Sequence, residues 1–134
     1  MTDPVVVLDS GAIDQAVGNA EFRWLLRDLV EQGWVPMIPT VVLAEATTGR
    51  ASDAPVNRAV KQIGPVDTGP STARLAGRLR FAVRRSGSRR IPGGIDAIVA
   101  AHAAEVGSGV VFTTDPSDLQ RLLTDFPRVL VKKP

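Results

Sequence analysis

Residues 5–12 read VVVLDSGA, an apolar run of four residues that ends in an aspartate. The run is too short for a helix and is rich in β-branched valine, so we expect a buried strand. A strand that is apolar on both faces is typical of a parallel sheet covered by helices on either side. Asp9 would then lie at the carboxyl end of a buried strand in an α/β fold.

Apolar runs and helical patterns alternate along the rest of the chain. We expect further strands at residues 34–38, 65–67, 110–113 and 129–131, and helices at residues 13–32, 40–46, 52–63, 72–85, 95–106 and 116–123. Strands that alternate with helices favour a three-layer α/β/α architecture with a central parallel sheet of four to five strands. The 134 residues contain no internal repeat or long linker, so we expect a single domain over residues 1–134.

The composition restricts the kinds of site and location. Without cysteine, disulfides and thiolate metal sites are excluded, which leaves oxygen ligands and the single histidine, His102. His102 follows Asp96 by six residues and lies nearly on the opposite side of the same helix, so we expect a packed or surface histidine.

No apolar stretch is long enough to span a bilayer, and the acidic N-terminus is unlike a secretory signal. We therefore expect a cytoplasmic protein with no membrane contact.

Four acidic residues, Asp9, Glu45, Asp96 and Asp115, end apolar runs or lie near helix starts. In open parallel sheets, ligands bind beyond the carboxyl ends of the strands, where the strand order reverses. Asp9 and Asp115 follow strands, Glu45 lies early in the helix after the second strand, and Asp96 follows a Gly-Gly pair. We therefore expect all four at one edge of the sheet. Clustered carboxylates raise each other's pKa, and a divalent cation would offset their repulsion.

Each of these acids also has a purely structural interpretation. Asp9 and Asp115 are suited to cap the helices that follow them, and Asp115 precedes a proline, as helix caps often do. Asp96 is suited to the first turn of a helix, where the helix dipole favours acids. Glu45 is harder to explain in this way, because it stands among apolar residues and an unpaired carboxylate is costly when buried.

A basic segment lies between the second and third of these acids. Residues 68–95 contain seven arginines and no Asp or Glu, although the net charge of the whole chain is only +2. A basic surface beside an acidic site is suited to hold a polyanion, and a solvated helix face is the alternative. The candidates for phosphate contacts surround a Gly- and Ser-rich loop: Arg84, Arg85, Arg89 and Arg90. A groove for an acidic partner segment is another use for them. Aromatic residues are few, which argues against base stacking.

Four segments together resemble the PIN-domain family, and within it the VapC toxin ribonucleases of bacterial toxin–antitoxin pairs. They are VVVLDSGA at residues 5–12, PTVVLAEAT at residues 39–47, GGIDAIVAAHA at residues 93–103 and VVFTTDPSDLQRL at residues 110–122. An acid after an apolar strand is common, so no segment is specific alone. Their order, spacing and total length match the small single-domain members over essentially the full chain.

The resemblance implies an endoribonuclease that depends on Mg²⁺ or Mn²⁺ and acts as the toxin of a toxin–antitoxin pair. Such an enzyme hydrolyses RNA phosphodiester bonds, with tRNA or other structured RNA as the expected substrate, and so inhibits translation and growth. By the same resemblance, the catalytic residues and metal ligands are Asp9, Glu45, Asp96 and Asp115. The implied partners are RNA, a cognate antitoxin protein and a second copy of the chain in a homodimer.

Three more residues have a supporting role by this resemblance. Thr113 matches a hydroxyl residue two positions before the last acid and would position a water or a carboxylate. Asp118 matches an additional acidic position and would either support the site or cap a helix. Ser10 would support Asp9 or, as we favour, cap the first helix.

Dimers in this family commonly form through early helices. The apolar residues Phe22, Trp24 and Leu25 are compatible with such an interface, and equally with a core.

Other functions have partly similar sequences. Receiver and haloacid-dehalogenase-like domains also place an Asp after the first strand, but Gly11 stands where the dehalogenase-like pattern has a second acid. Lys132 and Lys133 come too late for the lysine of either class. A housekeeping RNA-processing nuclease of the PIN type and a catalytically silent PIN-like module that binds RNA or protein remain as alternatives.

Overall fold

The valine run forms the central strand of a parallel sheet. The computed structural model describes residues 2–134, and β1 (Val5–Leu8) has the bounds expected from the sequence. The five strands lie in the order β3-β2-β1-β4-β5, and all their pairings are parallel. The other strands are β2 (Val35–Pro39), β3 (Pro65–Val66), β4 (Gly109–Phe112) and β5 (Val129–Lys132).

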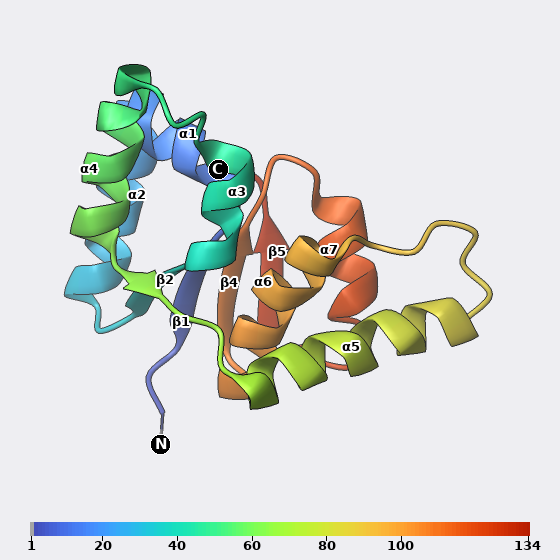
Figure 1. Ribbon diagram of the computed structural model, residues 1–134. Coiled ribbons are helices and arrows are strands. Elements are labelled where there is room, and N and C mark those ends of the chain that lie inside the picture. Colours follow the sequence, from blue (N-terminus) through green and yellow to red (C-terminus); the bar gives the residue numbers. More distant parts are fainter. Residues whose placement is uncertain (1) are drawn as a thin grey trace.

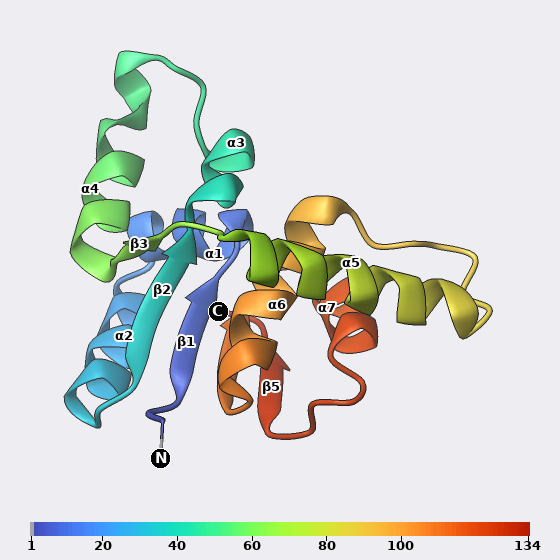
Figure 2. The same cartoon turned by 60° about the horizontal axis from the view of Figure 1, so that its bottom comes forward.

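Helices cover both faces of this sheet, so the predicted three-layer α/β/α architecture is confirmed. The layer formed by α1 (Ser10–Gly18), α2 (Ala20–Glu31) and α4 (Ala54–Ile63) lies on one side in Figure 1. The other side holds α5 (Pro70–Arg85), α6 (Gly94–Val106) and α7 (Pro116–Leu122), and Figure 2 shows the same division. A short segment at the upper edge of the sheet contains the 3₁₀ turn Thr40–Val42 and α3 (Leu43–Ala46), and a second 3₁₀ turn (Ala51–Asp53) precedes α4.

The strand order reverses between β1 and β4. From β1 the chain adds β2 and then β3 on one side, and β4 and then β5 are added on the other. The two strands approach closely because Gly109, at φ +152°, has no side chain, and a Cβ there would collide with backbone atoms of Val5. The backbone N–H of Asp9 also donates to the Phe112 carbonyl at 3.3 Å, so the pairing continues to the end of β1.

The core explains why α6 can lie directly on the sheet. All four residues of β1 are buried, and the buried side of α6 consists largely of alanine, which lets the helix backbone come close to the strands. On the opposite face, the rings of Phe22 and Phe112 meet edge to face, with centroids 5.0 Å apart. Phe22 therefore belongs to the core, whereas Trp24 and Leu25 are exposed.

Two local expectations from the sequence are wrong. The helix expected over residues 13–32 is two helices, because Asn19 ends α1 and its side-chain oxygen accepts a hydrogen bond from the backbone N–H of Phe22 in α2, at 3.2 Å. The helix expected over residues 40–46 begins as a 3₁₀ turn and is α-helical only from Leu43. The Thr40 hydroxyl donates to Asp67 at 3.2 Å and does not cap a helix.

Two other features bear on function. His102 is buried and its Nε2 lies 2.9 Å from the Thr68 hydroxyl, so it is a packed histidine far round the helix from Asp96. Within residues 2–134, no helix has the length and apolar character needed to cross a membrane.

Candidate active site

Asp9 lies at the carboxyl end of β1, where the strand order reverses. Its Oδ1 accepts a hydrogen bond from the backbone N–H of Ala12 at 2.9 Å, so it does cap α1. Burial nevertheless raises the pKa of Asp9, although hydrogen bonds from Thr113 and from the backbone of Ala12 and Gly11 act to lower it. The charge of Asp115 adds to the rise. Capping and membership of an acidic site are therefore compatible for this residue.

The surroundings of Asp96 show that the acidic residues gather. Asp96 lies in the first turn of α6 and is half-buried, and its pKa is raised to about 6. Burial is the largest cause, and the negative charges of Asp118, Asp9, Glu45 and Asp115 follow in that order. Carboxylates from four other places in the sequence thus lie close enough to act on this one. The expectation that the acids share one edge of the sheet agrees with this arrangement.

Glu45 and Asp115 occupy the exposed side of this cluster. Glu45 is exposed on the single-turn helix α3, so the cost of burying an unpaired carboxylate does not arise for it. Asp115 stands at the N-cap position of α7, but its side chain accepts no capping hydrogen bond there. Helix capping therefore does not account for Asp115.

Thr113 connects the ends of β1 and β4. Its side chain is almost completely buried, and its hydroxyl oxygen accepts a hydrogen bond from the backbone N–H of Asp115 at 3.1 Å. The same hydroxyl acts on Asp9, whose pKa it lowers. Thr113 therefore fixes the backbone that carries one acid and stabilises the charge of another.

The carboxylates surround Asp96 but do not meet at one point. Among residues 2–134, no three Asp, Glu or His side chains stand close enough together to hold one metal ion. The donors are nonetheless of the kind that fits Mg²⁺, which prefers oxygen and is usually bound by one or two carboxylates together with waters and substrate phosphates. The raised pKa of Asp96 is the electrostatic cost that a bound cation would offset.

Asp118 differs from the other acids because it is paired with cations. Its side chain is only 5% exposed, and it forms ion pairs with Arg121 on the same helix and with Arg90, whose Nη2 is 3.3 Å from Oδ2. It is therefore not a helix cap. The cap predicted for Ser10 is also wrong, because Asp9 occupies that position and Ser10 is the first residue of α1.

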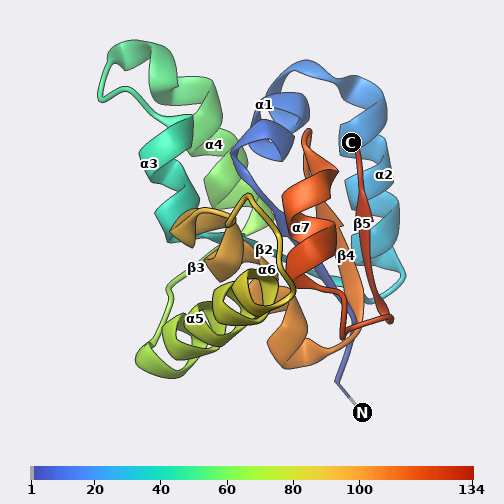
Figure 3. The same cartoon turned by 90° about the vertical axis from the view of Figure 1, so that its right-hand side faces the viewer.

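The basic loop between α5 and α6 runs beside α7, as Figures 1 and 3 show. Two contacts fix its second half: Arg80 Nε donates to the Pro92 carbonyl at 2.8 Å, and Ser88 donates to the Arg90 carbonyl at 2.8 Å. Of the four arginines predicted to bind RNA, only Arg90 forms an ion pair in the part of the chain that the structure describes. The other three, Arg84, Arg85 and Arg89, are exposed.

Sequence reasoning missed Arg121 and Asp53. The spacing of three residues between Asp118 and Arg121 on a predicted helix was the available indication of their pairing. Asp53 was expected only to start a helix. Its carboxylate accepts hydrogen bonds from the backbone N–H groups of Thr48 and Gly49, at 2.9 and 2.7 Å, and so closes the loop that follows Glu45. These hydrogen bonds hold the pKa of Asp53 below its usual value.

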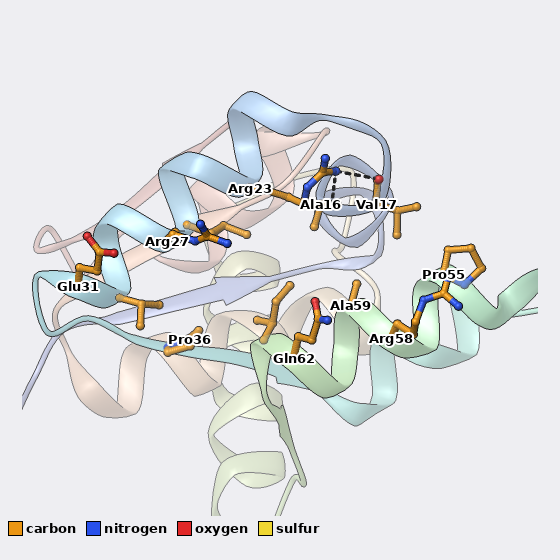
Figure 4. A pocket seen from close by; sticks show the side chains of 13 residues that line it. Ala16, Val17, Arg23, Arg27, Glu31, Pro36, Pro55, Arg58, Ala59 and Gln62 are labelled. Carbon is orange, nitrogen blue, oxygen red and sulfur yellow. Dashed lines mark hydrogen bonds between the residues drawn. The ribbon is translucent and has the colours of Figure 1, made fainter.

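A groove between α2 and α4 lies apart from the acids. Figure 4 shows that Arg23, Arg27 and Arg58 line it together with small apolar residues. Arg23 is held at one end by hydrogen bonds to the carbonyls of Ala16 and Val17, at 3.2 and 2.9 Å. None of the acids of the cluster borders this groove.

Comparisons with known proteins identify the fold. No protein-family model matches the chain, and no curated protein matches it in sequence. Solved structures do match. A chain of VapBC2 from Rickettsia felis, bound to a DNA fragment from its promoter, is 16% identical with a TM-score of 0.73, over 97% of this chain and 98% of that one. A chain of VapBC-1 from nontypeable Haemophilus influenzae is 17% identical with a TM-score of 0.69, over 96% and 97%. A chain of FitAcB from Neisseria gonorrhoeae is 15% identical with a TM-score of 0.64, over 95% and 96%.

These likenesses extend over nearly the whole of each chain. They confirm, at the level of the fold, the resemblance to VapC-type PIN domains that the four sequence segments indicated. Identities of this size show the fold alone, so the chemistry of the site depends on its own residues.

Proposed function

We propose that this chain is a metal-dependent endoribonuclease that acts as the toxin of a toxin–antitoxin pair. The observation that carries the proposal is the gathering of Asp9, Glu45, Asp115 and Asp118 around Asp96. Burial first, and then the charges of these acids, raise the pKa of Asp96 to about 6. The fold that the chain shares with VapBC and FitAB chains supports the toxin role.

In this proposal, Asp9, Glu45, Asp96 and Asp115 are the ligands for Mg²⁺ or Mn²⁺. One or two of these carboxylates would contact an ion directly, and the others would bind it through its waters. When bound, the metal supplies an activated water and offsets negative charge on the phosphodiester. The chain contributes position and charge. The buried strand end fixes Asp9, the Thr113 hydroxyl fixes the backbone of Asp115, and the exposed Glu45 and Asp115 leave the site open to a long substrate. No histidine takes part, since His102 is packed against Thr68.

Structured RNA, especially tRNA, is the substrate that we propose, because a backbone of phosphates matches the basic surface beside the acids. Arg84, Arg85 and Arg89 are exposed on α5 and the loop after it and can meet phosphates away from the reaction. The protein would act in the cytoplasm, where tRNA and ribosomes are found.

The proposed partners are a cognate antitoxin and a second copy of the chain. The similar solved structures are complexes named VapBC and FitAB, two of them with bound DNA, which supports an antitoxin partner. Trp24 and Leu25 are exposed on α2 and are our candidates for a homodimer contact.

The test is cleavage of total RNA with and without Mg²⁺ or Mn²⁺ by the wild-type protein, Asp9→Asn and Asp96→Asn. We expect cleavage by the wild type only, and only with metal, with losses of about 10²-fold or more in the variants, because each change removes a charge from the site. Equal cleavage by all three proteins would exclude this site as the nuclease.

A growth assay separates a toxin from a housekeeping nuclease. Expression of a toxin should arrest growth, and co-expression of the adjoining gene should relieve the arrest. Expression without arrest, together with metal-dependent cleavage, would instead favour RNA processing.

A further inference from the structure

Asp118 is a buried carboxylate shared by two arginines from different parts of the chain. Arg121 comes from the next turn of α7, and Arg90 reaches over from the loop between α5 and α6. Burial of a carboxylate without partners is costly, so this pairing explains how Asp118 can be only 5% exposed beside other acids. Two guanidinium groups against one carboxylate leave one positive charge in excess at this place.

Both arginines keep hydrogen-bond donors that Asp118 does not use. Each guanidinium has five N–H groups, and the ion pairs engage Nη2 of each residue. The Arg90 side chain is 69% exposed and the Arg121 side chain 37% exposed. Arg121 Nε is buried and has no hydrogen-bond partner among the residues that the structure describes. The exposed part of each guanidinium therefore presents donors and positive charge towards solvent, whereas Arg121 Nε does not reach solvent.

This basic pair lies at the border of the acidic cluster. Asp118 lies in the first turn of α7, three residues after Asp115, which stands at the N-cap position of that helix. The arginines that Asp118 holds therefore stand next to an acid proposed for catalysis. The loop is tied to α5 just after Arg90, where Arg80 Nε donates to the Pro92 carbonyl, and Ser88 donates to the Arg90 carbonyl within the loop. Arg90 is thus held in place, unlike an arginine on a free loop, and loses less entropy on binding an anion.

We propose that Asp118 is a positioning residue that holds Arg90 and Arg121 beside the acidic cluster, where the two guanidinium groups bind an RNA phosphate adjacent to the bond that is cut. The inference rests on the proposed function and makes it more specific. It gives Asp118 a supporting role that does not involve the metal. It also separates Arg90 from the other three arginines, which act through charge alone. Arginine suits this role because its planar fork binds phosphate through two donors at once.

The test compares Arg90→Ala, Arg90→Lys and Asp118→Asn with the matched control Arg128→Ala. Arg128 is exposed and directly precedes β5, so it lies at the opposite edge of the sheet from the acids. KM and kcat for RNA, the Mg²⁺ concentration for half-maximal rate, and the thermal midpoint are measured for each. In parallel, RNA binding without metal is measured by fluorescence anisotropy in the Asp96→Asn background over a range of salt concentrations.

We expect Arg90→Ala to raise KM about 10-fold, the usual size for one charge-assisted contact, and to leave the half-saturating Mg²⁺ concentration unchanged. The slope of log affinity against log salt should fall by about 1. Arg90→Lys should recover only part of the loss. Asp118→Asn should raise KM in the same way. Combining it with Arg90→Ala should raise KM little further, because both changes remove the same ion pair between Asp118 and Arg90.

The inference would be overturned if Arg90→Ala had the same KM and kcat as Arg128→Ala. It would also be overturned if Asp118→Asn needed a much higher Mg²⁺ concentration while its KM for RNA was unchanged. If Asp118→Asn unfolds, Arg90→Ala and Arg90→Lys still decide the matter, since Arg90 is on an exposed loop. Failure of the proposed function is visible separately. A wild type that cleaves no RNA, but whose metal-free RNA binding depends on Arg90, would refute the nuclease and keep the phosphate site. A protein that neither cleaves nor binds RNA would refute both.

Discussion

The raised pKa of Asp96 makes the stability of the metal-free protein depend on pH. The carboxyl has a pKa of about 6 in the folded protein, against a usual value of 3.8. The folded state therefore binds this proton more tightly than the unfolded state. Stability from this group is fully present below pH 3.8 and is lost as the pH rises through about 6.

We therefore expect Asp96→Asn to raise the free energy of unfolding of the metal-free protein at pH 7 and to reduce its fall between pH 4 and pH 6. Urea denaturation at several pH values measures both. Asp14→Asn, on the exposed side of α1, is the control for loss of one charge. If both variants have the same free energy of unfolding at pH 7, the charged Asp96 carboxylate does not destabilise the folded protein.

Gly11 lies against Thr114, the residue before Asp115, and a Cβ at position 11 would overlap the Thr114 side chain. We expect Gly11→Ala to destabilise the protein by about 1–3 kcal/mol and to lower cleavage, because the backbone of Asp115 must shift. Adding Thr114→Ala to Gly11→Ala should restore part of the lost stability and part of the lost RNA cleavage. Gly18→Ala is the matched control, since nothing lies within 4 Å of its added Cβ. A double variant no better than Gly11→Ala would place the cause elsewhere.

At this scale the sequence identified the acids but not all of their surroundings. Asp9 and Asp115 could be predicted because each directly follows an apolar strand, and parallel strands end at one edge. The ion pair of Asp118 with Arg90 could not, because it joins residues that are far apart in the sequence through the path of a loop. The apolar neighbours of Glu45 in the sequence did not indicate its exposure, because α3 is a single turn in which no residue is buried.

Among the elements, the pairing of β1 with β4 depends on Gly109. A Cβ at this position would collide with backbone atoms of Val5, which cannot move aside as a flexible side chain can. We expect Gly109→Ala to cost about 3 kcal/mol or more and to give largely insoluble protein, because the two central strands must separate. Gly77→Ala on the open face of α5 should have the opposite sign, a gain of up to about 1 kcal/mol. Soluble Gly109→Ala protein with an unchanged melting temperature would contradict the close approach.

The loop after α3 depends on Asp53 in a comparable way. With Asp53→Ala, the backbone N–H groups of Thr48 and Gly49 lose their acceptor, and the segment that carries Glu45 loosens. We expect trypsin to cleave faster after the exposed Arg50, and RNA cleavage to fall. Ser52→Ala, in the same turn and also exposed, is the control. Unchanged proteolysis would show that the loop is held by other contacts.

Element types could be predicted better than their junctions. The strand at residues 5–8 and the helix beginning near Gly94 follow from continuous apolar runs with clear ends. The break at Asn19 could not be seen, because the apolar spacing continues across it while the helix axis turns. Local capping chemistry prevailed there over periodicity.

For the whole molecule, a bound divalent ion should stabilise the fold. Since an ion bound only by the folded state adds stability in proportion to the logarithm of its concentration, we expect a gain of about 2.7 kcal/mol at a Mg²⁺ concentration 100 times the dissociation constant. Differential scanning calorimetry with increasing Mg²⁺ measures this, and chelation should reverse it. The gain should be much smaller in Asp96→Asn. A melting temperature that does not change with Mg²⁺ or Mn²⁺ in the wild type would argue against a resident metal.

The expectation of one domain over residues 1–134 stays a prediction, which a single cooperative transition in the same scans would support.

The position of β4 beside the central strand β1 has a consequence for synthesis. A growing chain makes β1, β2 and α5 before Gly109, so the edge that holds Asp9 stays without β4, the strand that precedes Asp115, until β4 has been made. Folding during translation proceeds from the N-terminus and cannot complete this site early. In the proposed ribonuclease, the acids on either side of the strand-order reversal would therefore come together only after β4 has been made.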